Sequence, residues 1–315
     1  MQNSRTKKLG VAAIWVILIA AVFFAAARVM ASGADIAYLL ALQGLRETSG
    51  SQMTTLMRYI TYLGESTLPV VLGSVLFWCV DKRAGERLLT FNVVGTGVNQ
   101  LIKATACVYR PWVRDARVTP VAKAMTTATG YSYPSGHTAN AGSWTMGLGA
   151  WLKDKCASKG GRTALWVGLT LVWLLVGFSR NMLGVHTPQD VGVMILLMFP
   201  IMLVCEKALR FADEGAKQEN IVAALGVAFG VLLAVWAAVK SYPLDYDEAG
   251  KLLVDPAVLT IDTFKTAGMV VGFFVGWLCE RRFIGFTVEG KVVGRILRGV
   301  VGVAVILAAE LGLTP

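Results

Sequence analysis

The chain has 315 residues, of which 55% are hydrophobic and only 16% are charged. Soluble domains carry nearer a quarter of charged residues, so this composition excludes an ordinary soluble protein and indicates an integral membrane protein. The formal net charge of +10 does not indicate a nucleic-acid partner, because Lys and Arg collect in short segments between apolar runs, as they do in the cytoplasmic loops of membrane proteins.

The first apolar run covers about residues 10–30 and follows a basic start that includes Lys7 and Lys8. A run of about 20 apolar residues can cross a bilayer, so we predict an uncleaved first transmembrane helix. The alternative is a signal peptide, for which residues 25–27, all alanine, would supply the small residues of a cleavage site. The mixed stretch 31–64 predicts an amphipathic, interfacial or re-entrant segment.

Eight further apolar segments, separated by charged or turn-forming residues, predict eight more membrane spans. The fold class is therefore predicted to be all-α, a polytopic transmembrane helix bundle. An acidic loop, residues 241–263, lies between two of the last spans and is expected to be a solvated cap. The predicted spans cover about residues 66–80, 88–109, 138–151, 164–178, 188–205, 221–239, 267–279 and 292–313.

The distribution of Lys and Arg predicts the orientation of the bundle, since cytoplasmic loops are enriched in both. An N-terminus in the cytoplasm places the basic segments 82–87, 153–162, 207–217 and 281–282 on the cytoplasmic side. Short loops of this kind indicate the plasma (inner) membrane. Three cations of the outer loop, Arg114, Arg117 and Lys123, run against this distribution, and a bound substrate anion would explain them.

Three short motifs fall on the predicted outer side of the membrane. The chain has two histidines, and each belongs to one of these motifs. Ionisable residues at membrane level are costly and usually functional. In chain order the motifs are Lys103 with Arg110-Pro111, then Pro134-Ser135-Gly136-His137, then Ser179-Arg180 with His186 and Asp190.

The segment His186-Thr187-Pro188-Gln189-Asp190 predicts the start of a helix. Thr187 suits the N-cap, Pro188 the first helical position and Asp190 the third, as in a capping box. His186 and Asp190 would then lie one turn apart, so the carboxylate could fix the imidazole tautomer and stabilise its positive charge. The alternative is that Asp190 only caps the helix.

Three cations, Lys103, Arg110 and Arg180, are expected near membrane level without matching acids beside them in sequence. Unpaired, they would repel one another and lose solvation. A phosphate dianion would satisfy all three through charge-assisted hydrogen bonds, and the helix start at Ser135-Gly136 would offer backbone N–H groups to the same anion. The alternative for Lys103 and Arg110 is snorkelling toward lipid headgroups.

Together the three motifs, in this order and spacing, resemble those of the type-2 phosphatidic acid phosphatase (PAP2) superfamily over about residues 60–210. The resemblance implies a six-helix core, to which this chain adds about three helices, and catalysis without a metal or other cofactor. It also implies that His186 is the nucleophile, that Asp190 orients it, and that His137 is the general acid. The residues that the resemblance assigns to the phosphoryl oxygens are Lys103, Arg110, Ser135, Gly136 and Arg180.

We divide the chain into an N-terminal transmembrane helix with an interfacial segment (1–58), a PAP2 catalytic core (59–212) and a C-terminal transmembrane extension (213–315). The expected function is metal-independent dephosphorylation of a membrane lipid phosphate or diphosphate through a phosphohistidine at the non-cytoplasmic face. The candidate substrates are phosphatidate, isoprenyl diphosphates and sphingoid phosphates, and the expected partners are this lipid and the bilayer. The alternatives are a lipid phosphotransferase and a non-catalytic protein that binds or transports a lipid phosphate.

Overall fold

The computed structural model describes residues 20, 23 and 25–313, and these residues form helices and no strands. The predicted all-α fold is therefore confirmed, whereas most of the first predicted span, about 10–30, lies outside the described residues. The helices are α2 (Ala34–Thr48), α3 (Gly50–Tyr62), α4 (Thr67–Val75), α5 (Lys82–Ala106), α6 (Pro111–Arg114), α7 (Ala122–Met125), α8 (Gly136–Leu152), α9 (Lys159–Met182), α10 (Pro188–Ala212), α11 (Ala216–Val239), α12 (Pro256–Cys279) and α13 (Val292–Leu313).

The polytopic character of the bundle is also confirmed. By length and hydropathy, five helices can cross a membrane, namely α9, α10, α11, α12 with its continuation to Ile284, and α13. Two bent pairs raise this number to as many as seven: Ala25–Ser32 with α2, bent by 67°, and α3 with Thr67–Val80, bent by 45°. The stretch 31–64, predicted to be interfacial or re-entrant, therefore belongs to helices that are sharply bent against their neighbours.

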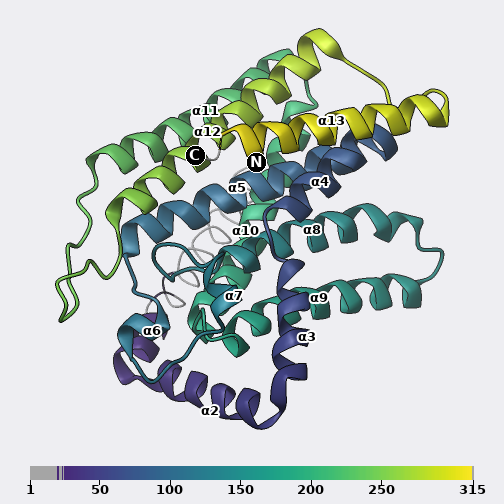
Figure 1. Ribbon diagram of the computed structural model, residues 1–315. Coiled ribbons are helices and arrows are strands. Elements are labelled where there is room, and N and C mark those ends of the chain that lie inside the picture. The colour runs from purple at the N-terminus through teal and green to yellow at the C-terminus, as the bar shows by residue number, and fades with distance from the viewer. Residues whose placement is uncertain (1–19, 21–22, 24, 314–315) are drawn as a thin grey trace, which may run out of the picture.

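Helix α5 lies at the centre of the bundle, where it contacts α4, α8, α10 and α12 (Figure 1). It begins after Asp81, whose carboxylate accepts the Ala84 N–H at 3.0 Å as an N-cap. Its 25 residues extend about 37 Å at 1.5 Å per residue, so its two ends lie at opposite ends of the bundle. Helix α5 begins before the predicted span 88–109, because Lys82 is paired with Glu280, after α12, and Glu86 with Arg83 of the same helix.

Three helix ends meet at the end of the bundle opposite the start of α5. Helices α8 and α9 pack against each other and α10 packs against both. The buried Trp173 of α9 joins them, because its indole N–H donates to the Thr138 carbonyl at 2.8 Å. As a result, the start of α8, the end of α9 and the start of α10 come together, and each carries one or more of the predicted site residues.

The C-terminal extension is built on a close pair, α11 and α12 (Figure 1). Helix α12 begins at Pro256, eleven residues before the predicted start of its span at 267, so the acidic loop 241–263 was predicted too long. The reason is local: Asp255 caps the helix by accepting the Ala257 N–H at 2.9 Å, and Pro256 occupies the first helical position.

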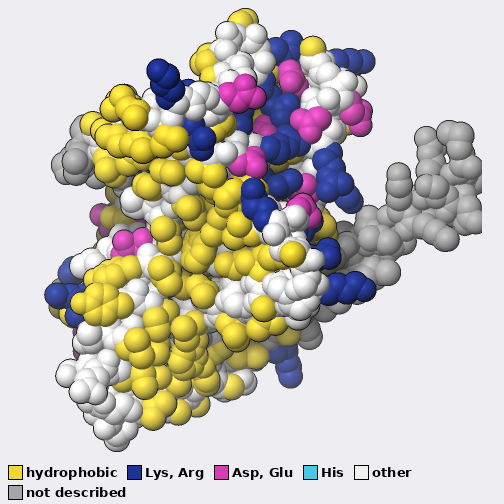
Figure 2. All heavy atoms as spheres, turned by 90° about the vertical axis from the view of Figure 1, so that its right-hand side faces the viewer, with side chains coloured by type: hydrophobic (Ala, Val, Ile, Leu, Met, Phe, Trp, Pro, Cys, Tyr) yellow, Lys and Arg dark blue, Asp and Glu magenta, His cyan; other side chains and the backbone are white. Residues whose placement is uncertain are grey.

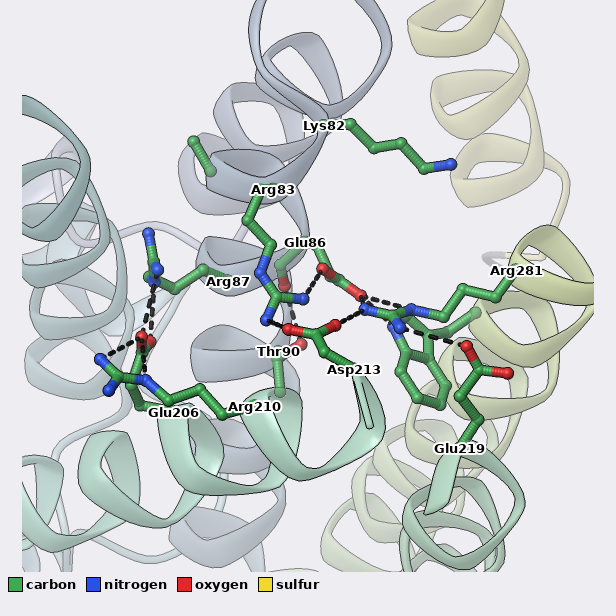
Figure 3. Close-up of polar contacts among 12 residues, drawn as sticks. Lys82, Arg83, Glu86, Arg87, Thr90, Glu206, Arg210, Asp213, Glu219 and Arg281 are labelled. Carbon is green, nitrogen blue, oxygen red and sulfur yellow. Dashed lines mark hydrogen bonds and ion pairs between the residues drawn. The ribbon is translucent and has the colours of Figure 1, made fainter. Parts of the chain in front are cut away.

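Basic residues that the charge distribution placed on one face do lie together at the end of the bundle where α5 starts. Lys and Arg gather in the upper part of this face, with Asp and Glu among them (Figure 2). At its centre, the buried Glu86 of α5 accepts from Arg83 at 2.6 Å and from Arg281, after α12, at 2.7 Å (Figure 3). Arg281 also contacts Asp213 at 3.0 Å and Glu219 at 3.3 Å. This network ties the C-terminal extension to the core.

We predict that the α11–α12 contact tolerates no side chain at Gly226, because an added Cβ would overlap the ring of Phe274. Gly226→Ala should lower the free energy of unfolding by about 1–3 kcal/mol through overpacking. Thermal unfolding of the protein in detergent measures this change. Gly272→Ala is the matched control, since a Cβ at Gly272 meets nothing within 4 Å; an equal loss in both variants would contradict the prediction.

Candidate active site

The three motifs meet at the end of the bundle opposite the ionic network. The Arg110 Nη1 lies 3.0 Å from the His186 Nε2, which joins the first motif to the third. The Ser135 N–H donates to the Asp190 carbonyl at 3.0 Å, which joins the second motif to the third. Lys103, near the end of α5, lies close enough for the charges of Arg110, Asp190 and Arg180 to act on it.

The predicted helix start at Thr187 is present as a complete capping box. Thr187 is the N-cap of α10, Pro188 takes the first position, and the side chains and N–H groups of Thr187 and Asp190 satisfy each other. The Thr187 N–H donates to Asp190 Oδ2 at 2.8 Å, and the His186 Nδ1 lies 3.3 Å from the same oxygen. Asp190 therefore caps the helix and contacts the imidazole at once, so the two readings of the sequence do not exclude each other.

The contacts of His186 define its tautomer. Because a guanidinium can only donate hydrogen bonds, the Nε2 that faces Arg110 must be an acceptor. The proton then resides on Nδ1 and faces Asp190. Burial, and after it the charges of Arg110, Arg180 and Lys103, lower the pKa of His186 well below its usual range. At neutral pH the ring is uncharged and directs the lone pair of Nε2 toward the cations.

The Arg110 side chain is held inside the protein and not at its surface. It is 3% exposed, and it donates to the carbonyls of Thr129 at 2.8 Å, Gly130 at 3.2 Å and Val185 at 3.1 Å. Burial lowers the pKa of Arg110 to about 10, so the group remains charged at neutral pH. The carbonyls orient the guanidinium, and no carboxylate of the described residues forms an ion pair with it.

Several polar atoms around His186 are buried without a hydrogen-bond partner among the described residues. These atoms are Nε and Nη2 of Arg180, Nε2 of His137 and Oδ1 of Asp190. Arg180 is fully buried, and its Nη1 donates to the Thr61 hydroxyl at 2.9 Å. A buried charge with unused donors is unfavourable unless something completes it. The oxygens of a phosphate would accept from the guanidinium and from a protonated His137.

The start of α8 supplies a further group of donors. The Ser135 hydroxyl caps this helix by accepting from Thr138, and the Ser135 N–H is taken by Asp190. The next two N–H groups, of Gly136 and His137, belong to the first helical turn, where backbone donors have no partner within the helix. Ser135 thus positions the helix start, and Gly136 and His137 offer the N–H groups that could bind an anion.

Four further residues contact the site but were not identified as site residues by the sequence analysis. The Ser132 hydroxyl donates to Asp190 Oδ2, and the Asn181 amide donates to the His186 carbonyl at 2.9 Å. Thr61 contacts Arg180, and a Cβ on Gly64 would lie 2.9 Å from the Cβ of His137. Ser132 and Asn181 adjoin the motifs and could have been considered, whereas the approach of residues 61–64 leaves no signal in the spacing.

Two of the three outer-loop cations already have acidic partners. Arg114 pairs with Asp35 at 2.5 Å, and Arg117 pairs with Asp115 at 2.7 Å. A substrate anion is not needed to explain these two, which corrects the expectation for them. The ion pairs of the described chain do not include Lys123, the third cation.

Comparison with known proteins agrees with the motifs. Residues 87–212 match the family described as the PAP2 superfamily, and residues 264–315 match the family described as PAP2 superfamily phosphatase, transmembrane extension. Phosphatidylglycerophosphatase B of Bacillus subtilis (strain 168) is 28% identical over 173 residues, which cover 51% of this chain and 80% of that protein. The crystal structure of the first transmembrane PAP2 type phosphatidylglycerolphosphate phosphatase from Bacillus subtilis aligns with a TM-score of 0.48 at 25% identity, covering 61% of this chain and 94% of that one.

We predict that Ser132 positions Asp190. Ser132→Ala removes a hydrogen bond to a buried carboxylate, an interaction of about 1.5–3 kcal/mol, so the rate of phosphate release from a lipid phosphate should fall roughly tenfold or more. Steady-state kinetics should show the loss in kcat, with KM nearly unchanged. Ser74→Ala, at a buried serine of α4, is the control; equal losses in the two variants would count against this role.

Proposed function

Because the chain belongs to the PAP2 superfamily and is a membrane phosphatase of that type, we propose that it removes phosphate from a lipid through a phosphohistidine on His186, at the non-cytoplasmic face of the plasma membrane. The observation that carries the proposal is the set of buried nitrogens of Arg180 and His137 that lie beside the His186 imidazole and have no hydrogen-bond partner among the described residues. A phosphate group supplies acceptor oxygens for the guanidinium N–H groups and for a protonated His137.

Binding comes first. The phosphate oxygens accept from Nε and Nη2 of Arg180, from the N–H groups at the start of α8, and from Lys103. Arg110 exchanges its contact with the His186 Nε2 for one with a phosphoryl oxygen. This exchange frees the nitrogen lone pair and places a positive charge where negative charge grows in the transition state.

The chemical step follows from the tautomer. The His186 Nε2 attacks phosphorus and forms an N–P bond while the bond from phosphorus to the lipid oxygen breaks. Protonated His137 gives its Nε2 proton to that oxygen, which leaves as an alcohol from a phosphate monoester or as a lipid monophosphate from a diphosphate. The imidazole becomes positively charged, and Asp190 stabilises it through the Nδ1–H contact of 3.3 Å. Neutral His137 then takes a proton from water, whose oxygen attacks the phosphohistidine and releases phosphate.

The orientation rests on the two ends of α5. Its first turns carry Arg83 and Glu86 of the ionic network, and its last turn carries Lys103. The 20 residues from Arg83 to Lys103 rise about 30 Å, close to the thickness of the hydrocarbon core. With the Lys- and Arg-rich end in the cytoplasm, the phosphate site reaches the outer leaflet.

The position of the site at one end of the bundle limits the class of lipid substrate. A site at one end of a membrane bundle receives the headgroup while the acyl or isoprenyl chain stays in the bilayer. Phosphatidate, isoprenyl diphosphates and sphingoid phosphates all satisfy this requirement. The name of the relative from Bacillus subtilis adds phosphatidylglycerophosphate as a fourth substrate to test.

The test is phosphate release by purified full-length protein in detergent, with a chelator and no added metal. Release from at least one of the four lipids is expected, together with a loss of at least ~10³-fold in His186→Ala, because removal of the nucleophile of a covalent mechanism is among the largest single losses. Glu248→Ala, at an exposed loop residue, is the control and should keep the activity.

Two outcomes would contradict the proposal. Activity of His186→Ala within tenfold of the parent would exclude the phosphohistidine. Activity that requires an added divalent cation and is lost when a chelator is present would exclude the metal-independent reaction. Lipid binding without phosphate release would instead favour the phosphotransferase or the binding protein.

A further inference from the structure

A cavity of about 180 Å³ opens beside the phosphate site, between α3 and the segment that carries α7. Thr61 belongs both to its wall and to the site, because the Thr61 hydroxyl accepts from the buried Arg180 at 2.9 Å. None of the roles assigned above uses this cavity. The residues that line it are Arg58, Thr61, Tyr62, Glu65, Lys123, Ala124, Thr126 and Thr127, three of which carry a charge.

The charges of this cavity are not balanced. Arg58 and Lys123 are its two cations and Glu65 is its one carboxylate. The Arg58 Nε is buried and has no hydrogen-bond partner among the described residues. Neither cation belongs to any ion pair of the described chain. A buried guanidinium nitrogen without a partner, together with a net positive lining, favours an anionic ligand.

The position of Arg58 sets the distance of such a ligand from the reacting phosphate. Arg58 and Thr61 are three residues apart on α3 and so share one face of that helix, about 5–6 Å apart at their Cβ atoms. Thr61 touches Arg180, which we place on the reacting phosphate. The cavity therefore begins about one helical turn from the phosphoryl site, within the reach of one headgroup.

We propose that this cavity is a subsite for a second phosphate group carried by the same lipid, with Arg58 and Lys123 as its ligands. The inference rests on the proposed function and narrows its substrate class. A second phosphate can be joined to the first directly, as in an isoprenyl diphosphate, or through a glycerol unit, as in phosphatidylglycerophosphate. Phosphatidate has no second phosphate and leaves the subsite without its anion.

The experiment compares kcat/KM for phosphatidate, an isoprenyl diphosphate and phosphatidylglycerophosphate. Wild-type protein should prefer at least one lipid with a second phosphate over phosphatidate. Arg58→Gln and Lys123→Gln should each lower that preference by about tenfold, as expected for the loss of one charge-assisted hydrogen bond. The lipid whose kcat/KM relative to phosphatidate falls in these variants identifies how the two phosphates are linked. Arg117→Gln is the matched control, because it removes an outer-loop cation that is paired with Asp115, and it should leave the preference unchanged.

Binding of the same three lipids to His186→Ala separates this inference from the proposed function. The binding preference for a second phosphate does not require turnover, so it should persist in this variant and fall when Arg58→Gln is added. Absence of turnover in the wild type together with this preference would overturn the enzyme mechanism and keep the subsite. Equal affinity for all three lipids, or a preference that Arg58→Gln and Lys123→Gln do not change, would overturn the subsite.

Discussion

The burial of Arg180 is the constraint on which the rest of this site depends. Its side chain is fully buried at the end of α9, and only one of its three nitrogens has a partner among the described residues. The carbonyl of the same residue accepts from Val185 at 3.1 Å and from His186 at 3.4 Å. One residue therefore fixes the loop that carries the imidazole and supplies the unused donors beside it. An oxyanion bound there would accept hydrogen bonds from these unused donors and balance the buried charge.

The two polar ends of α5 differ in how their charges are satisfied. At the start of the helix, Glu86 and its partners form a network in which acids and bases are matched, so the C-terminal extension is attached without a ligand (Figure 3). At the other end, Arg110 is oriented by carbonyl oxygens and contacts the imidazole. Matched charges stabilise a junction, whereas cations that have no counter-ion among the described residues remain available for a substrate.

The sequence predicted those parts of the site that depend on residues close together in the chain. The capping box at Thr187 and the meeting of His186 with Asp190 follow from the spacing of one helical turn, and the structure confirms both. The segments that come from elsewhere could not be predicted, because the contact of Thr61 with Arg180 joins residues 119 positions apart. The length of the acidic loop was overestimated because the helix start at Asp255-Pro256, which is visible in the sequence, was not recognised.

The melting temperature of the full-length protein in detergent, with and without orthophosphate, tests most directly whether an anion completes the site. A ligand that binds only the folded state raises its stability in proportion to the logarithm of its concentration. The account predicts that orthophosphate raises the melting temperature more than chloride at equal ionic strength, and that Arg180→Gln abolishes the difference while Arg117→Gln retains it. No difference between the two anions in the parent protein, or the same difference in Arg180→Gln, would contradict it.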